Sequence, residues 1–203
     1  MIAIERHPLQ PFLPPTARLL ILGSFPPPKR RWAMNFFYPN FPKQTWQVFS
    51  LVFFDNADRL LDKATHTFKQ SDIQALLEER GIAIYHTACA VRRLSGNASD
   101  KDLEIVEKTD IPALLAQIPH CHDIVCTGQK SFSVLTDDYG VPMPEMGTYR
   151  EFHLSCSPKI GELSEGLRSM KLWRMPSSSR AYPMKLEEKA GYYREMMKTI
   201  GLI

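Results

Sequence analysis

The 203-residue sequence has few cysteines and no arrangement of them that suits a metal. Its four cysteines include no C-x-x-C pair, and the four-residue gap between Cys121 and Cys126 has no matching second pair. This argues against zinc and iron–sulfur sites, which use paired thiolates at short spacing. We therefore expect reduced, mostly buried thiols, no metal and no cofactor.

Long apolar runs are missing as well. No segment reaches the roughly 18 apolar residues that a membrane span needs, and no charged-then-apolar leader opens the chain. Internal repeats and low-complexity stretches are also absent. The sequence thus predicts a cytoplasmic, monomeric protein without membrane contact. It would form one domain over residues 1–203, whose residues 1–17 are an extended, proline-rich N-terminal segment.

The excess of positive charge is small, at +3, so a nucleic-acid partner is allowed but not required. The positions of the cations are more informative than their sum. They cluster at Lys29, Arg30 and Arg31, and again at Arg92 and Arg93. Each cluster alone is also typical of a solvated surface.

The hydrophobic pattern alternates between strand-like and helix-like segments. Short apolar runs predict strands over residues 18–25, 82–88, 123–128, 151–156 and 171–176. Helical periodicity predicts helices over residues 71–81 and 109–118, after Gly128, and from Leu186 to Ile200. Ser71 and Gln74 predict a capping box for the first of these helices, and Gly81 its C-cap.

This alternation predicts an α/β fold, a three-layer α/β/α sandwich around a short, mainly parallel four-stranded sheet. Ligands of such sheets bind at the carboxyl ends of the strands. The candidate loops are therefore those that follow Gly23, residues 86–93, Gly128 and residues 176–182. These loops also hold many of the clustered cations and a run of serines.

The first of these loops combines prolines, cations and aromatic rings. Nine of the 21 aromatic residues lie between Trp32 and Phe54. The helical spacing of Trp46, Phe49 and Phe53 is typical of core positions. Phe37 and Tyr38 lie nearer the strand end, where one ring could stack on a flat ligand while the neighbouring cations hold phosphates.

Two later loops also carry polar groups. "TGQKS" at residues 127–131 lacks the first glycine of a phosphate loop and is interpreted as a strand-to-helix junction. Ser177, Ser178, Ser179 and Arg180 follow a predicted strand and lie between two prolines. A stiff loop of small donors suits a phosphate backbone or a DNA groove. The alternative is a flexible serine-rich linker.

Several of these motifs together resemble the uracil-DNA glycosylase superfamily, most closely its mismatch-specific and hypoxanthine-DNA glycosylase branch. The resemblance rests on "ILGSFPP", the Phe37-Tyr38-Pro39 run, Trp46, "IYHTACAVRRLSGNASD" at residues 84–100, which ends in the Ser99-Asp100 pair, and "MPSSSRAY". It extends from about residue 19 to residue 193, with the motifs in the expected order.

The resemblance implies a DNA glycosylase of base-excision repair, acting on double-stranded DNA. Such enzymes flip a deaminated or mismatched base out of the duplex and hydrolyse its N-glycosidic bond. By the same resemblance Gly23, Ser24 and Phe25 would form the base pocket, and Phe37 or Tyr38 would stack on the base. The basic clusters Lys29, Arg30, Arg31, Arg92 and Arg93, together with Ser177, Ser178, Ser179 and Arg180, would contact the DNA.

The position of the branch's functional asparagine is Lys43, counted back from Trp46. An insertion or deletion would place Gln44 there instead. The candidate catalytic residues are therefore Lys43, Gln44 and Ser24.

Three alternatives remain open. The chain could be a catalytically weak DNA-damage-binding relative. Lys43 could form a Schiff base with the sugar, which would make the protein a glycosylase and lyase. Finally, the chain could be an α/β enzyme that does not act on nucleic acid, with His86 or His153 as general base.

Overall fold

The computed structural model describes residues 2–41, 44–95, 100–155, 167–179 and 182–203. Its strands are β1 (Ile4–Arg6), β2 (Leu19–Gly23), β3 (Leu61–Asp62), β4 (Thr67–Phe68), β5 (Ile82–His86), β6 (Ala88–Arg93), β7 (Leu103–Lys108), β8 (Asp123–Cys126), β9 (Tyr149–Ser155) and β10 (Leu167–Arg174). Its helices are η1 (Lys29–Arg31), α1 (Gln44–Phe54), α2 (Gln70–Arg80), η2 (Asp100–Asp102), α3 (Ile111–Gln117), α4 (Gln129–Tyr139) and α5 (Leu186–Thr199).

The main sheet has the strand order β5-β2-β8-β10-β9. The first four strands are parallel, and β9 pairs with β10 in the antiparallel direction. The predicted four-stranded sheet is therefore one strand too small, because residues 149–155 and 167–174 form an antiparallel pair at its edge. All five residues of β2 are buried, as expected of a central strand covered on both faces.

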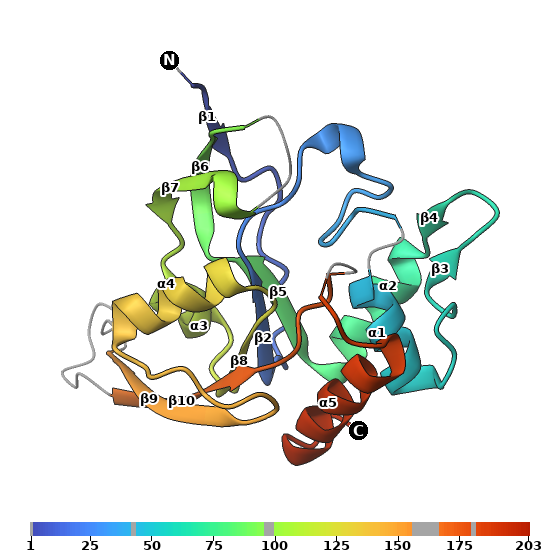
Figure 1. The fold of residues 1–203 in the computed structure, drawn as a ribbon. Coiled ribbons are helices and arrows are strands. Elements are labelled where there is room, and N and C mark those ends of the chain that lie inside the picture. Colours follow the sequence, from blue (N-terminus) through green and yellow to red (C-terminus); the bar gives the residue numbers. More distant parts are fainter. Residues whose placement is uncertain (1, 42–43, 96–99, 156–166, 180–181) are drawn as a thin grey trace.

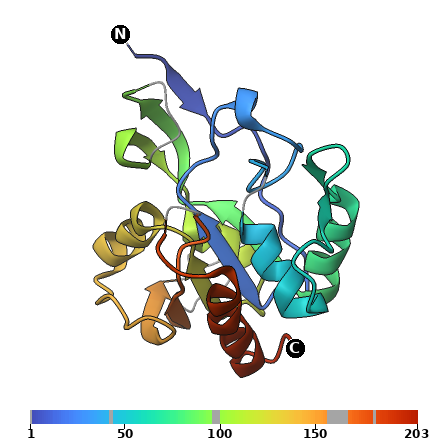
Figure 2. The same ribbon diagram turned by 45° about the vertical axis from the view of Figure 1, so that its right-hand side comes forward.

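Helices cover both faces of this sheet (Figures 1 and 2). Helices α3 and α4 lie on one side, and α1, α2 and α5 on the other, with α1 packed against α5. This distribution follows from right-handed crossovers, since the chain moves outward from β2 to β5 and then returns across β2 to β8 and β10. The predicted layered α/β arrangement is found.

A second, three-stranded sheet has the order β1-β6-β7. The prediction had placed residues 86–93 in a loop, and this is wrong. The main-sheet strand ends at His86, and the next strand begins at Ala88 and pairs antiparallel with both β1 and β7. Ala88, Val91 and Leu103 of this sheet form a small buried apolar cluster with Phe25. The extended N-terminal segment is thus partly a strand.

Helix α2 begins one residue before its predicted start and without a capping box. Its N-cap is Lys69, whose side chain makes no capping bond. The predicted C-cap is confirmed, because Gly81 has φ 65°, the left-handed conformation that glycine adopts without strain. Helix α3 begins after Asp110, whose carboxylate accepts a hydrogen bond from the Ala113 amide at 2.9 Å.

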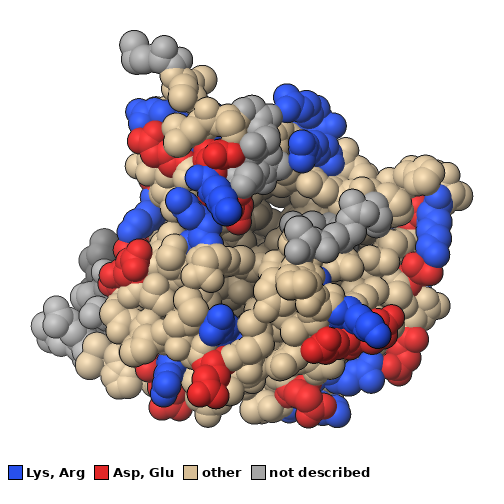
Figure 3. All heavy atoms as spheres, viewed as in Figure 1, with Lys and Arg blue, Asp and Glu red and all other residues tan. Residues whose placement is uncertain are grey.

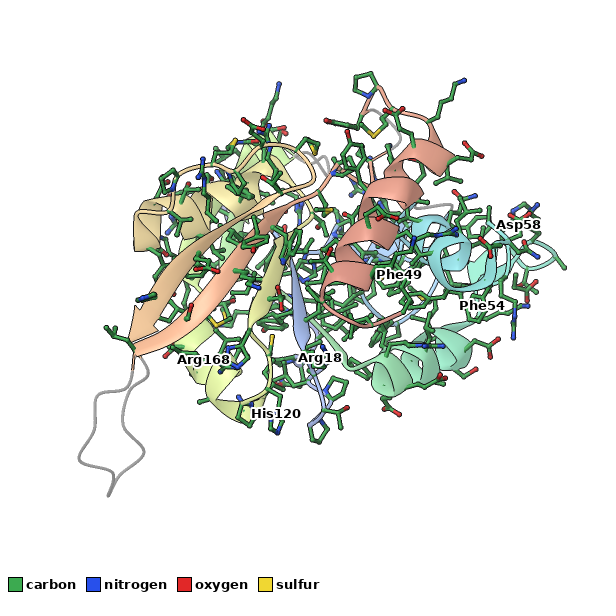
Figure 4. The ribbon with its side chains drawn as sticks, turned by 90° about the horizontal axis from the view of Figure 1, so that it is seen from below. Arg18, Phe49, Phe54, Asp58, His120 and Arg168 are labelled. Atoms are coloured by element: carbon green, nitrogen blue, oxygen red, sulfur yellow. The ribbon has the colours of Figure 1, made fainter. Side chains whose placement is uncertain are left out.

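The amino ends of the parallel strands carry structural arginines (Figure 4). Arg18, just before β2, donates to the carbonyl oxygens of Ile200 and Gly201 after α5. Arg168 of β10 donates to Leu115 O at 2.8 Å and Ile118 O at 3.0 Å, at the end of α3. Both guanidinium groups satisfy carbonyls at helix C-termini, so this edge of the sheet is used for anchoring the helices.

No helix in the part of the chain that the structure describes is both long and apolar enough to cross a membrane.

Candidate functional site

The carboxyl ends of the parallel strands surround a cavity of about 420 Å³. In-register pairing brings these ends together, since Gly23 lies opposite His86 and Leu22 lies opposite Cys126. The wall is built from Gly23 at the end of β2 and Ser24 after it, His86 of β5, residues 127–130 after β8 and residues 177–179 after β10. The molecular face in Figure 3 is hollowed here, and Lys and Arg side chains gather above the hollow. The cavity lies where the topology predicts a ligand site.

Gly23 forms a narrow part of the cavity floor. A Cβ atom at this position would lie 2.5 Å from Cδ2 and 2.9 Å from Nε2 of His86, and 3.4 Å from the Tyr38 hydroxyl. Contacts below 3.0 Å require a neighbour to shift. Glycine is therefore required here because its backbone lies directly against the imidazole ring, and not because of its conformational freedom.

His86 is held by a second histidine from the N-terminal segment. His86 is buried, and its Nδ1 lies 2.8 Å from Nε2 of His7. Nδ1 of His7 in turn lies 2.8 Å from the Leu9 carbonyl oxygen. Burial lowers the pKa of His7 from 6.5 to about 4, with the hydrogen bond to Leu9 opposing this shift. His7 is therefore neutral at physiological pH, and the pair fixes the ring of His86 beside Gly23.

The two candidate stacking rings occupy different environments. Phe37 is 1% exposed, and its ring packs edge-on against Phe36 in the core. Tyr38 lines the cavity, and its hydroxyl lies 3.0 Å from Oγ1 of Thr127. Tyr38 has φ 50°, an uncommon backbone conformation for a residue with a side chain. This turn places Tyr38 at the cavity. The backbone before it is held by Trp46, whose Nε1 donates to the Phe37 carbonyl at 3.2 Å.

Ser24 is bonded to a carboxylate from a distant part of the chain. Its Oγ donates to Oδ1 of Asp100 at 2.7 Å, and both residues line the cavity. Asp100 begins the short helix η2, which precedes β7 of the second sheet. The short helix η2, which leads into β7 of the second sheet, therefore supplies part of the cavity wall.

The candidate catalytic residues have different outcomes. Ser24 lines the cavity, and its catalytic role stays a prediction. Gln44 begins α1, and its Oε1 accepts a hydrogen bond from Nζ of Lys189 at 2.7 Å. Gln44 is not among the described residues that line the cavity. Lys43 lies outside the described residues, so its catalytic role stays a prediction.

Residues 177–179, which we call the serine loop, are held by hydrogen bonds to buried parts of the protein. Ser178 is buried, and its Oγ lies 2.7 Å from Oγ1 of Thr45. Lys189 donates from Nζ to the Ser179 carbonyl at 2.7 Å, and Ser177 Oγ accepts from the Ser179 amide at 3.2 Å. These bonds favour a stiff loop over the alternative of a flexible linker. All three serines line the cavity, whereas Arg180 lies outside the described residues.

The predicted DNA-binding cations lie at different depths. Lys29, Arg30 and Arg31 form the exposed helix η1. Arg92 forms a 3.0 Å ion pair with Glu104 on the second sheet.

Arg93 is buried. Its guanidinium pairs with Glu5 of β1 at 3.1 Å and donates to the Pro26 carbonyl at 3.0 Å. Nothing in the sequence indicates this internal bonding, and a phosphate contact by Arg93 stays a prediction.

Five ionisable residues at the candidate site had no role in the prediction from the sequence. Asp100, Lys101 and Lys130 line the cavity, while His7 and Lys189 support residues that do. For Lys189 the sequence does offer a signal. It is a cation within an otherwise apolar stripe of a helix, next to Ala190 and one turn before Tyr193. For His7 the sequence offers no local signal.

Among the described residues, no group of three or more His, Cys, Asp or Glu side chains could hold a metal ion.

The low pKa of His7 predicts an acid-sensitive fold. At neutral pH the ring is neutral in both folded and unfolded chains. Below about pH 6.5 the unfolded chain binds a proton that the folded chain does not bind until about pH 4. The free energy of unfolding should therefore fall as the pH falls through this window. Because the ring is partly solvent-accessible, we expect a loss of roughly 1–2 kcal/mol between about pH 7 and pH 4.5.

Denaturant unfolding of the wild type and of His7→Gln across this range measures the effect. The difference in stability between them should shrink as the pH falls, because the variant lacks the titrating ring. The matched control is His120→Gln, an exposed histidine at the opposite edge of the sheet (Figure 4). Equal pH slopes for wild type and His7→Gln would contradict the prediction.

Comparison with known proteins points to a fold. Neither a protein-family model nor a curated protein matches the chain. A solution NMR structure from Methanosarcina acetivorans, described as a "putative Uracil DNA glycosylase", is similar to it with a TM-score of 0.57. The two share 17% sequence identity over 96% of this chain and 99% of that chain. The likeness shows a shared fold over nearly the whole of both chains.

Proposed function

We propose that the protein is a DNA glycosylase of base-excision repair, which flips a deaminated or mismatched base out of a duplex and hydrolyses its N-glycosidic bond. The observation that carries this proposal is the cavity at the carboxyl ends of the parallel strands. Its volume of about 420 Å³ is in the usual range for a small-molecule site. It presents an aromatic ring, small polar groups and cations to the same space, which suits a nucleotide.

Each part of the cavity has a role in this proposal. Tyr38 would stack on the flipped base, a contact worth about 1–3 kcal/mol per base. Polar groups of Ser24 and His86 would meet the edge of the base. As the bond to the sugar breaks, negative charge develops on the departing base, and positioned donors stabilise it.

The DNA backbone would be held by cations above and beside the cavity. Lys101 and Lys130 line it, and the exposed helix η1 adds three further cations. Such contacts position a duplex without reading its sequence. Binding should accordingly weaken as salt is raised. The identity of the base, among uracil, hypoxanthine and similar bases, belongs to the proposal as well.

A base-release panel tests the proposal. Purified protein in excess is incubated with duplexes that contain uracil, hypoxanthine, xanthine or mismatched thymine, and the free base and the abasic product are measured over a single turnover. We expect release from at least one duplex, and none from an otherwise identical duplex with normal pairs.

Tight, salt-sensitive binding to damaged duplex without release of any base would favour the DNA-damage-binding alternative. A product that borohydride traps on the protein would favour the Schiff-base alternative.

A further inference from the structure

The cavity contains a carboxylate that the binding of DNA does not explain. Asp100 is the one acidic residue among the described residues that line it. A negative charge in a site for a polyanion weakens binding, because it repels the phosphates. Its presence therefore indicates a task other than holding the substrate.

The geometry leaves one side of this carboxylate facing the cavity wall at the end of β8. Oδ1 accepts the hydrogen bond from Ser24 Oγ at 2.7 Å. Oδ2 lies 3.4 Å from the position that a Cβ atom of Gly128 would occupy. Because Gly128 has no side chain, the space beside Oδ2 is kept open. Among the described residues, none donates a hydrogen bond to Oδ2, so this oxygen can orient a small molecule such as water while Oδ1 is held by Ser24.

Resting on the proposed glycosylase function, we propose that Asp100 is a catalytic carboxylate of this cavity. It binds and deprotonates the attacking water and stabilises the cationic sugar of the transition state. Ser24 is its positioning residue, because the Oγ–Oδ1 hydrogen bond fixes the orientation of the carboxylate. This assigns a role to a residue of the short helix η2 that was not among the candidate catalytic residues.

The reaction balances with water as the second reactant. The bond between the sugar C1′ and the base nitrogen breaks, and its electron pair leaves with the base. The oxygen of the water forms a new bond to C1′, and one of its protons passes to Asp100. The base takes up one proton, either from the solvent or from a donor in the cavity. Asp100 returns its own proton to the solvent, so the products are the free base and an abasic sugar.

The position of Gln44 supports this assignment over an amide-based one. The Oε1 atom of Gln44 is bonded to Lys189, and Gln44 is not among the described residues that line the cavity. An amide also cannot accept the proton of the attacking water, whereas a carboxylate can. General-base assistance of this kind contributes typically about 10²- to 10⁴-fold to a rate.

Asp100→Asn separates the charge from the hydrogen bond, because the amide oxygen can still accept from Ser24. We expect single-turnover base release to fall by about 10²- to 10⁴-fold. Binding is measured with a duplex whose target nucleotide carries a 2′-fluorine and is not cleaved. It should become about two- to tenfold tighter, since a repulsive charge is gone. A merely structural role would not give slower release together with tighter binding.

Two further variants complete the test. Asp102→Asn, on the same short helix, removes a carboxylate that accepts from Ser95 and should leave base release unchanged. In Asp100→Ala, added formate should restore at least about tenfold of the lost rate, because a free carboxylate can occupy the emptied space. Formate should not accelerate the wild type. Thermal melting shows whether each variant is folded.

The two proposals fail in different ways. No base release by the wild type from any duplex overturns the glycosylase function, and the role of Asp100 with it. Release by the wild type, with Asp100→Asn within about threefold of it, overturns the role of Asp100 alone. Should Asp100→Asn be unfolded, the response of Asp100→Ala to formate decides, and an absence of rescue counts against the proposal.

Discussion

Replacement of Gly23 by alanine is expected to abolish most base release while the protein still folds. The new Cβ atom would lie 2.5 Å from Cδ2 of His86, a ring that His7 holds in place. Either the end of β2 or the imidazole must therefore move. A displacement of about 1 Å in a catalytic site can lower the rate about 100-fold, and we expect at least this loss in single-turnover release. Overpacking of the same kind lowers the free energy of unfolding by about 1–3 kcal/mol.

Gly191→Ala is the matched control for this experiment. Gly191 lies on the exposed face of α5, and a Cβ atom there would meet nothing within 4 Å. Alanine should stabilise the helix by about 0.5–1 kcal/mol and leave base release unchanged. Gly23→Ala with release close to that of the wild type would show that the floor of the cavity is more adaptable than its contacts indicate.

Lys189→Ala is expected to weaken the fold and the site together. Lys189 is fully buried, and its Nζ donates at 2.7 Å both to Gln44 of α1 and to the Ser179 carbonyl of the serine loop. Burial lowers the pKa of this amine. Truncation leaves two acceptors without their donor and opens a cavity beneath the loop. Each unsatisfied buried group costs about 1–3 kcal/mol, so we expect a loss of about 2–5 kcal/mol in the free energy of unfolding.

Measurement of the affinity for DNA distinguishes a role of Lys189 in holding the serine loop from a general loss of stability. At a temperature where Lys189→Ala remains folded, its affinity for damaged duplex should fall about tenfold, because the serine loop must then be ordered on binding. Lys198→Ala, which removes an exposed lysine paired with Glu195 on the same helix, should change neither stability nor affinity by much. Equal behaviour of the two variants would contradict the bracing role.

Local pattern and topology together predicted which segments of the chain meet at the candidate site. The buried run of β2, the strand ends and the serine loop were all predicted, and Gly23, Ser24 and Tyr38 do line one cavity. This works because parallel strands bring their carboxyl ends to one edge, whatever the details of packing. The choice between Phe37 and Tyr38 could not be made, because it depends on the positive φ of Tyr38.

The site residues that the sequence did not predict reach the cavity through long-range contacts. Asp100 meets Ser24 across 76 residues of sequence, and His7 meets His86 across 79. Both contacts depend on the second sheet or the N-terminal segment attached to it, and the pairing of β1 with β6 was not predicted. "ACAVRR" was interpreted as a loop, and of its two partner strands β7 follows closely whereas β1 lies far away in the chain. Periodicity reports which face is buried, but not which distant segment covers it.

The bonds that brace the serine loop have a consequence for how a duplex would be read. Thr45 and Lys189 fix this loop from below, so a nucleotide entering the cavity meets a wall whose shape is already set. Because the loop is held in place, the DNA rather than the protein must deform on binding. Extrusion of a nucleotide costs least where pairing and stacking are already weak. Discrimination would thus begin in the duplex itself, with the local melting tendency of each site acting as the first filter before any contact inside the protein.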